Sequence, residues 1–206
     1  MVTIALENSQ RLTSMINDLL DLDRISQDGL PMHVERRDLV GLVNQALVEN
    51  EAYAQRHGCR FVLAPAPGSV EVMMDPLRML QVMSNLLSNA AKFSPRGSDV
   101  QVVIIRDEES VLVEVSDAGP GIPEDFRPHI FDRFAQADAS DTRSNSGSGL
   151  GLAIARGLVE RMGGEIGYRS GDDNGSVFWF RLPLADGPQP PDSSPLSSSQ
   201  PPNESH

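Results

Sequence analysis

The first part of the chain alternates apolar and polar residues with a helical period. Spacings of three and four residues predict a helix with an a/d stripe of Ala5, Asn8, Leu12, Met15, Leu19 and Leu22. Ile16 widens this apolar face, and Asp28-Gly29 followed by Pro31 predicts the end of the helix. Because one amphipathic helix cannot bury its own stripe, we expect it to pair with another helix. The alternative is that it folds back onto the rest of the chain.

After residue 34 the pattern predicts a domain of interspersed helices and strands, without an internal repeat. The expected helices cover residues 38–57, 75–93 and 150–162, and the expected strands cover 60–63, 70–74, 100–106, 111–116, 165–170 and 177–184. Strands joined by hairpins, with helices between them, predict an α+β fold. We expect a two-layer α/β sandwich with a mixed, largely antiparallel sheet and helices on one face, preceded by the amphipathic helix.

The expected helix over 75–93 carries an unusual polar edge. Asp75 is a good N-cap, and Pro76 at the first helical position lacks only an N–H that would have no helical partner. Spacings of four, four and three place four polar side chains on one face: Gln81, Asn85, Asn89 and Lys92. Amide oxygens suit a hard cation and a lysine suits phosphate, so this edge is a candidate ligand site. The alternative interpretation is an ordinary solvated face.

Two glycine clusters add to this picture. Asp117-Ala118-Gly119-Pro120-Gly121-Ile122 follows an expected strand directly, and Gly147-Ser148-Gly149-Leu150-Gly151 opens an expected helix. Glycines allow close approach of the backbone to a ligand, and a helix N-terminus favours phosphate. Neither cluster matches the P-loop or the dinucleotide-binding glycine pattern, and each alone could be a simple turn. The long aperiodic stretch between them is typical of a functional loop.

Together, four motifs in this order resemble the catalytic domain of sensor histidine kinases. The segment from Asn85 to Phe93 resembles the N box, and the segment from Asp117 to Ile122 resembles the G1 box. Phe131-Asp132-Arg133-Phe134 resembles the F box, and the segment from Gly147 to Gly151 resembles the G2 box. The resemblance extends from about Leu12 to Leu184. It implies the Bergerat-type ATP-binding fold that is shared with type II topoisomerases, Hsp90 and mismatch-repair ATPases.

The resemblance also implies roles for individual residues. Asp117 would accept the adenine amino group, Asn89 and Asn85 would coordinate Mg²⁺, and Lys92 would contact phosphate. Phe131 and Phe134 would anchor a lid over about 123–146, although both could equally be core aromatics. The implied nucleotide-binding set is Asn85, Asn89, Lys92, Asp117, Gly119, Gly121, Ile122, Phe134, Gly147, Ser148, Gly149, Leu150 and Gly151.

The resemblance divides the chain into three parts. Residues 1–34 would be the second helix of a dimerisation and phosphotransfer hairpin, and residues 38–185 the ATP-binding domain. Residues 186–206 are predicted to be a disordered tail, since 12 of these 21 residues are Pro or Ser; a Pro-rich docking site is the alternative.

The chain lacks the expected phosphoacceptor, a histidine followed by an acidic residue; the four histidines are His33, His57, His129 and His206. We therefore expect a fragment or a short gene product that cannot phosphorylate itself and carries no catalytic residue of its own. Its expected partners are ATP, a response regulator or a kinase chain that bears the phosphoacceptor, and a helix-mediated dimer.

Other functions stay open. Hydrolytic relatives have Glu at the position of Asn85, which favours a kinase over an ATPase. Gln81 replaces a Glu that is frequent in the kinase family. A non-catalytic decoy that pairs with an intact kinase is the main alternative, and a serine kinase of the anti-sigma type is a third, against which the dimerisation-like helix argues.

Composition restricts the remaining classes. A formal net charge of −12 over 206 residues argues against a nucleic-acid binder. One cysteine, Cys59, excludes an intramolecular disulfide and suits a reducing compartment such as the cytoplasm, and one cysteine with four scattered histidines argues against a zinc site. No apolar run is long enough to span a membrane, and no signal segment begins the chain.

Overall fold

A computed structural model describes residues 2–27, 29–136, 148–171 and 175–186. The expected tail from 187 onward, Gly147 and most of the hairpin turn before Gly175 lie outside the described residues. The helices are α1 (Val2–Ser26), α2 (Leu39–His57), α3 (Pro76–Phe93) and α4 (Gly151–Arg161), with a short 3-10 helix at Arg127–His129. The strands are β1 (Glu35–Asp38), β2 (Arg60–Leu63), β3 (Glu71–Met74), β4 (Asp99–Arg106), β5 (Ser110–Asp117), β6 (Glu165–Ser170) and β7 (Ser176–Pro183).

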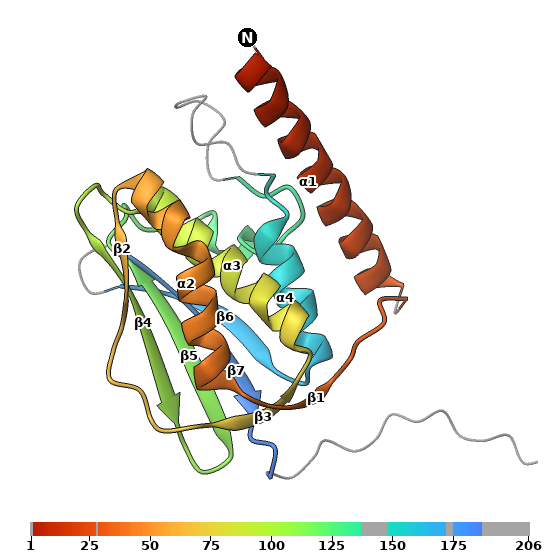
Figure 1. Cartoon of the computed structure of the whole chain (residues 1–206), viewed down its shortest axis with the longest axis vertical. Helices are drawn as coiled ribbons and strands as arrows, with labels where there is room; N and C mark the ends of the chain where they lie inside the picture. The colour runs from red at the N-terminus through yellow and green to blue at the C-terminus, as the bar shows by residue number, and fades with distance from the viewer. Residues whose placement is uncertain (1, 28, 137–147, 172–174, 187–206) are drawn as a thin grey trace, which may run out of the picture.

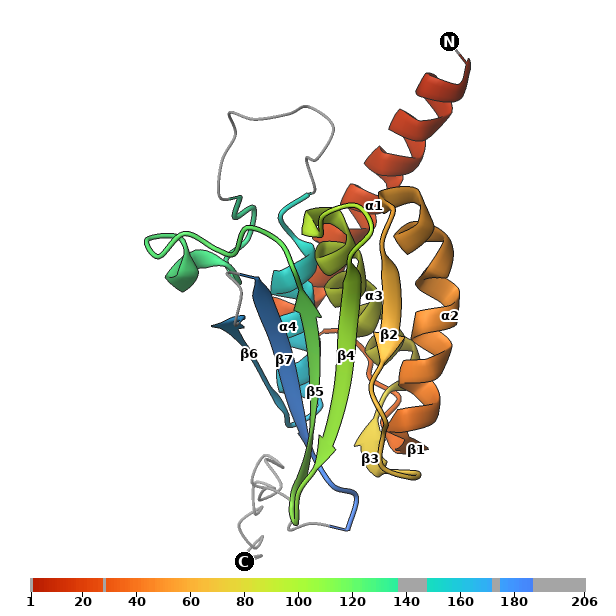
Figure 2. The same cartoon turned by 90° about the vertical axis from the view of Figure 1, so that its left-hand side faces the viewer.

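Five strands form the main sheet in the order β2-β4-β5-β7-β6. The β2–β4 pair is parallel and the other three pairs are antiparallel. Figures 1 and 2 show α2, α3 and α4 together on one face of this sheet. The expected α+β sandwich with a largely antiparallel sheet and helices on one face is therefore confirmed.

A second, two-stranded sheet was not expected from the sequence. β1 pairs antiparallel with β3, with Arg36 opposite Met73. Every residue of β1 is polar, so the strand shows no apolar alternation that a pattern could detect. The Arg36 guanidinium instead bonds the carboxylates of Glu71 at 2.6 Å and Asp186 at 2.9 Å, which ties β1 to β3 and to the end of the chain.

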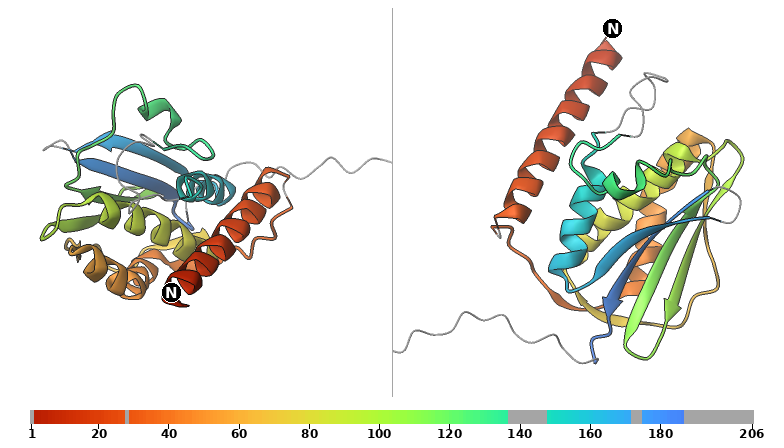
Figure 3. Two further views of the ribbon diagram at one scale, coloured as in Figure 1. Left: turned by 90° about the horizontal axis from the view of Figure 1, so that it is seen from above. Right: turned by 180° about the vertical axis from the view of Figure 1, so that it is seen from behind.

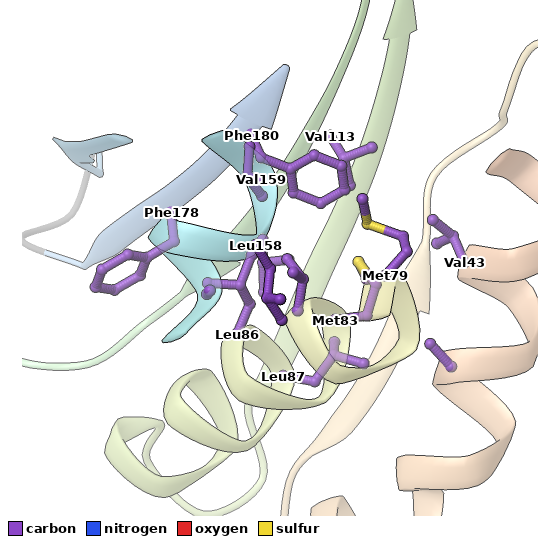
Figure 4. Packing of buried hydrophobic residues seen from close by; sticks show 14 of the residues in the cluster. Val43, Met79, Met83, Leu86, Leu87, Val113, Leu158, Val159, Phe178 and Phe180 are labelled. Atoms are coloured by element: carbon purple, nitrogen blue, oxygen red, sulfur yellow. The ribbon is translucent and has the colours of Figure 1, made fainter. Parts of the chain in front are cut away.

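The core lies between the sheet and the three helices, and α3 is at its centre. The apolar face that the sequence predicted for this helix is completely buried: Met79, Val82, Met83, Leu86, Leu87 and Ala90. In Figure 4, side chains of α4 and β7 surround it, among them Leu158, Phe178 and Phe180, and Val43 of α2 lies on its other side. Burial of one whole face fixes the rotation of α3 and therefore the direction in which its polar edge points.

Asp38 links the N-terminus of α2 to the second sheet. Its carboxylate accepts hydrogen bonds from the backbone N–H groups of Val40 at 3.2 Å and Gly41 at 3.1 Å, as an N-cap does. It also accepts from the N–H of Val70 at 2.9 Å, just before β3. One side chain thus caps a helix and positions a strand.

The last turns of α1 pack against the domain, while the middle of the helix is exposed. Leu22 is buried, and Ile25 lies against Gly157 of α4. Leu12 and Leu19, from the same predicted stripe, are 61% and 50% exposed. Figure 3 shows α1 beside α4 and extending past the domain at its N-terminal end. In the described part of the chain, no helix combines the length and the apolar character that crossing a membrane requires.

Candidate functional site

The polar edge of α3 meets the start of α4 at Asn85. The Nδ2 amide of Asn85 donates a hydrogen bond of 2.9 Å to the carbonyl oxygen of Gly151. A Cβ on Gly151 would lie 3.3 Å from Oδ1 of Asn85, tighter than an ordinary contact, so the absence of a side chain allows this approach. The N box and the second glycine cluster are therefore brought into direct contact.

The other members of the predicted ladder have different surroundings. Asn89 is half-buried, and among the described residues its side chain forms no hydrogen bond, so the amide is available to a ligand. The Nζ of Lys92 lies 4.7 Å from the centre of the Phe93 ring. Gln81 instead faces α1: its Nε2 donates to Asp21 at 3.0 Å, and its Oε1 accepts from Arg78 at 3.0 Å. Gln81 therefore helps to dock α1.

Asp117 is a buried carboxylate at the end of β5, with 7% of its surface exposed. Its Oδ1 accepts a hydrogen bond of 2.9 Å from the N–H of Gly119. Burial raises the pKa of Asp117 above its usual value, and hydrogen bonds from the backbone of Gly119 and Ser176 oppose this rise only in part. The site thus holds a strong hydrogen-bond acceptor in a place that water reaches poorly.

The first glycine cluster connects Asp117 to the C-terminal end of α3. A Cβ on Gly119 would lie 2.7 Å from Oδ1 of Asp117 and 2.8 Å from the carbonyl oxygen of Phe93, so only glycine fits there. Gly121 has a left-handed φ of 76°, and Ile122 is half-buried against the core. The polar edge of α3 is therefore bounded by one glycine cluster at Phe93 and by the other at Asn85.

The second glycine cluster leads into an open helix end. The Ser148 hydroxyl accepts a hydrogen bond of 3.3 Å from the N–H of Leu150. Leu150 occupies the N-cap position of α4 and cannot cap it with its side chain. The first N–H groups of α4 and the positive end of its dipole are therefore suited to an anion.

The two aromatic residues of the F box differ. Phe131 is half-buried and contacts Phe178 edge to face at 6.5 Å between ring centres, as a core aromatic would. Phe134 is 62% exposed and has a left-handed φ of 62°. The sequence did not distinguish these two environments.

The donor set fits Mg²⁺ held between amides and phosphate. Within the described residues, no three His, Cys, Asp or Glu side chains converge on a common point. In that part of the chain the Asn89 amide makes no hydrogen bond, while a Cβ would clash with Phe134 at Gly149 and lie tight against Asn85 at Gly151. Hard oxygen donors of this kind, together with phosphate oxygens, are what Mg²⁺ requires.

Comparison with known proteins decides the family. A model of the family described as histidine kinase-, DNA gyrase B-, and HSP90-like ATPase matches residues 74–186, from β3 through β7. The chain belongs to this family. The matched range includes α3, the buried Asp117 and the start of α4.

Relatives that match most of the chain include a sensory/regulatory protein and a histidine-protein kinase. The sensory/regulatory protein RpfC of Xanthomonas campestris pv. campestris is 35% identical over 192 residues, which cover 87% of this chain and 26% of RpfC. The signal transduction histidine-protein kinase AfsQ2 of Streptomyces coelicolor is 34% identical over 190 residues, which cover 92% of this chain and 34% of AfsQ2. The chain thus spans about a quarter to a third of these relatives, and it is an ATP-binding domain of the histidine kinase type.

A solved structure is also similar over most of the chain. Full-length ShkA, crystallised in complex with AMPPNP, superposes with a TM-score of 0.77 at 31% identity, over 89% of this chain and 38% of that one. The alignment covers more of this chain than the ATPase family model does, so the similarity is not confined to the sheet and its helices.

Sequence reasoning missed the residues of α1 that contact the site. The hydroxyl of Ser148 donates a hydrogen bond of 3.4 Å to Oδ2 of Asp18, and Arg78 bonds Asp21 at 3.2 Å. Asp18 and Ser148 are 130 positions apart, so no local pattern could pair them. The one available signal was the i, i+3 spacing of Asp18 and Asp21, which places both acids on one side of the helix.

Proposed function

We propose that this chain is the catalytic module of a two-component histidine kinase, which binds ATP with Mg²⁺ and transfers the γ-phosphoryl group to a histidine that these 206 residues do not contain. The observation that carries the proposal is the position of α3. Its edge from Asn85 to Lys92 runs between two glycine clusters, with Gly151 tight against Asn85 and Gly119 too close to the carbonyl oxygen of Phe93 to carry a side chain. A nucleotide along that edge would have its base at Asp117 and its phosphates at Gly149.

Each residue then has a role that its surroundings support. Asp117 accepts the amino group of adenine, and its burial makes the acceptor selective because competing water is scarce. Gly119, Gly121 and Ile122 line the base. Gly149, Leu150 and Gly151 present backbone N–H groups to the phosphates, and Ser148 adds a hydroxyl. Gly147 would extend this cradle, and Phe134 would close its side, as the family resemblance suggests.

The amides provide for the metal. Asn89 offers its side-chain oxygen, and Asn85 orients its own oxygen by donating its Nδ2 to Gly151. Bound Mg²⁺ would neutralise phosphate charge, and Lys92 adds a positive charge at the same end of α3. Rate enhancement in this arrangement would come from positioning and charge neutralisation, since phosphoryl transfer requires little covalent chemistry from the protein.

The phosphoacceptor comes from elsewhere. His33, His57 and His129 are not followed by an acidic residue, so the acceptor histidine would belong to another segment or another chain. The exposed side chains of Leu12, Ile16 and Leu19 on α1 suit pairing with a second helix, which would bring that histidine near. A response regulator would receive the phosphoryl group next, and the supply of ATP places the reaction in the cytoplasm.

A second candidate is a non-catalytic module that pairs with an intact kinase and inhibits it. The same exposed stripe on α1 favours it, since helix pairing alone would be sufficient. A non-catalytic module would have no use for the close contacts between α3 and the two glycine clusters. For this reason we rank this candidate second.

Calorimetry and phosphotransfer together test the proposal. Mg-AMPPNP should release heat with the wild-type chain and not with Asp117→Ala, while Glu108→Ala, in the exposed turn between β4 and β5, should bind as wild type. With γ-labelled ATP, the chain alone should stay unlabelled. It should label a full-length histidine kinase whose own nucleotide site has been inactivated. Inhibition of an intact kinase by a chain that binds no nucleotide would support the second candidate instead.

A further inference from the structure

The side of α1 that faces the domain carries two acidic residues one turn apart, Asp18 and Asp21. Asp21 is balanced by its surroundings: Arg78 lies 3.2 Å from its Oδ2, with both side chains 19% exposed, and Gln81 donates to the same oxygen at 3.0 Å. Asp21 therefore docks α1 onto α3 through an ion pair with Arg78.

Asp18 has a different environment. In the described part of the chain its hydrogen-bond donor is the Ser148 hydroxyl at 3.4 Å, a neutral group. Burial raises the pKa of Asp18, the Ser148 hydroxyl lowers it, and the neighbouring charge of Asp21 raises it again. Within the described residues, this half-buried carboxylate therefore has no cationic partner of the kind that Arg78 provides for Asp21.

Asp18 lies close to the second glycine cluster, where its negative charge can act on a bound anion. Ser148 connects Asp18 to the N–H of Leu150, the N-cap of α4, through two consecutive hydrogen bonds of 3.4 and 3.3 Å. The Ser148 hydroxyl is therefore the one group that bridges the carboxylate and the N-terminus of α4, which would bind phosphate. Leu22 in the core and Ile25 against Gly157 hold α1 in place, so that Asp18 cannot simply turn away with its helix.

We propose that Asp18 determines phosphate selectivity at this cradle: when α1 is docked, its carboxylate disfavours a nucleoside triphosphate more than a diphosphate. The inference rests on the proposed nucleotide site. Two negative groups on opposite sides of one hydroxyl repel each other, and the repulsion grows with the charge that the ligand places at the end of α4. By linkage, a bound triphosphate weakens the docking of α1 by the same factor.

The test is calorimetry on the full chain with Asp18→Asn, which keeps the size and the acceptor oxygen but removes the charge. We expect the variant to bind Mg-AMPPNP about three- to tenfold more tightly than wild type and Mg-ADP by a smaller factor, with adenosine unchanged. The gain should shrink as salt is raised. Asp23→Asn is the matched control, since Asp23 is on the exposed side of α1 and bonds only Gln27 among the described residues.

The outcomes separate the two proposals. Equal factors for all three ligands, or weaker Mg-AMPPNP binding by Asp18→Asn, would overturn the role of Asp18 and leave the nucleotide site intact. A wild-type chain that binds neither nucleotide would overturn the proposed function, and this inference with it. A gain of the same size in Asp23→Asn would also overturn it, because the effect would then be one of overall charge.

Discussion

The backbone N–H of Phe134 donates a hydrogen bond of 2.9 Å to the carbonyl oxygen of Gly149, and both residues have left-handed backbones, with φ of 62° and 69°. A bulky residue rarely adopts this conformation, which costs about 1–2 kcal/mol. Phe134 bears this cost beside Gly149, in the cradle that we propose for phosphate, and strained residues tend to gather at functional sites. The F box is thus attached to the G2 box through the backbone.

This pairing predicts that Gly149→Ala is more harmful than its φ alone would make it. A Cβ there would lie 2.8 Å from the carbonyl carbon of Phe134, whereas a Cβ on Gly163, with φ of 75°, has no heavy atom within 4 Å. Gly163→Ala should lower the free energy of unfolding by about 1 kcal/mol. Gly149→Ala should add to that a loss of Mg-AMPPNP affinity of about tenfold or more. Urea unfolding and calorimetry measure both; equal behaviour of the two variants would contradict the prediction.

The two asparagines of α3 should separate binding from stability. Asn89→Ala removes an amide that makes no hydrogen bond within the described residues, so magnesium-dependent affinity should fall about tenfold or more with little change in stability. Asn85→Ala also breaks the bond to Gly151, which should cost about 1 kcal/mol of unfolding free energy. Asn44→Ala, on the exposed side of α2, is the control. Loss of stability in Asn89→Ala would show that its amide has a structural role.

Base recognition should depend on pH through Asp117. Because burial raises the pKa of Asp117, the folded state favours the protonated carboxyl. The contribution of Asp117 to stability is therefore greatest below its usual pKa of 3.8 and is lost as pH rises through the raised folded pKa. Binding needs the ionised form, so ATP affinity should fall as pH drops through the same range.

Inosine triphosphate is the control for this prediction, since its base has an oxygen in place of the amino group. Wild-type protein should prefer ATP, and Asp117→Asn should show a smaller preference with less dependence on pH. An ATP affinity that is unchanged by pH, with an intact preference over inosine triphosphate, would remove Asp117 from the base site.

The contribution of Asp38 to stability should depend on pH in the opposite direction to that of Asp117. Burial alone would raise its pKa, but hydrogen bonds from Val70, Ser69, Gly41 and Val40 together lower it. Its stabilising contribution is thus full above 3.8 and is lost as pH falls through the lowered folded pKa. Asp38→Ala should cost about 1–2 kcal/mol at pH 7 and less in acid, measured by urea unfolding. A cost that stays constant down to acid pH would exclude the ionised cap.

The features that were predicted from the sequence are those that leave a periodic pattern of apolar residues. The apolar face of α3 and the hairpin strands followed from spacing, because burial of a face imposes that spacing over many residues. β1 was missed because its four residues are all polar, and because the residues with which Arg36 pairs, Glu71 and Asp186, are distant in the sequence. Gln81 was placed correctly on the polar edge of α3, but its partner Asp21 lies 60 positions away, which no local pattern contains.

One face of α3 lies entirely in the core, and its polar edge carries Asn85 and Asn89. The packing of the core beneath this helix therefore determines where these two amides lie. Met79 and Met83 are completely buried beneath it (Figure 4). Replacing either methionine with a larger or a smaller side chain would displace α3 and move its amides relative to both glycine clusters. Variants at these two methionines should therefore alter nucleotide binding, although both side chains are buried away from the proposed site.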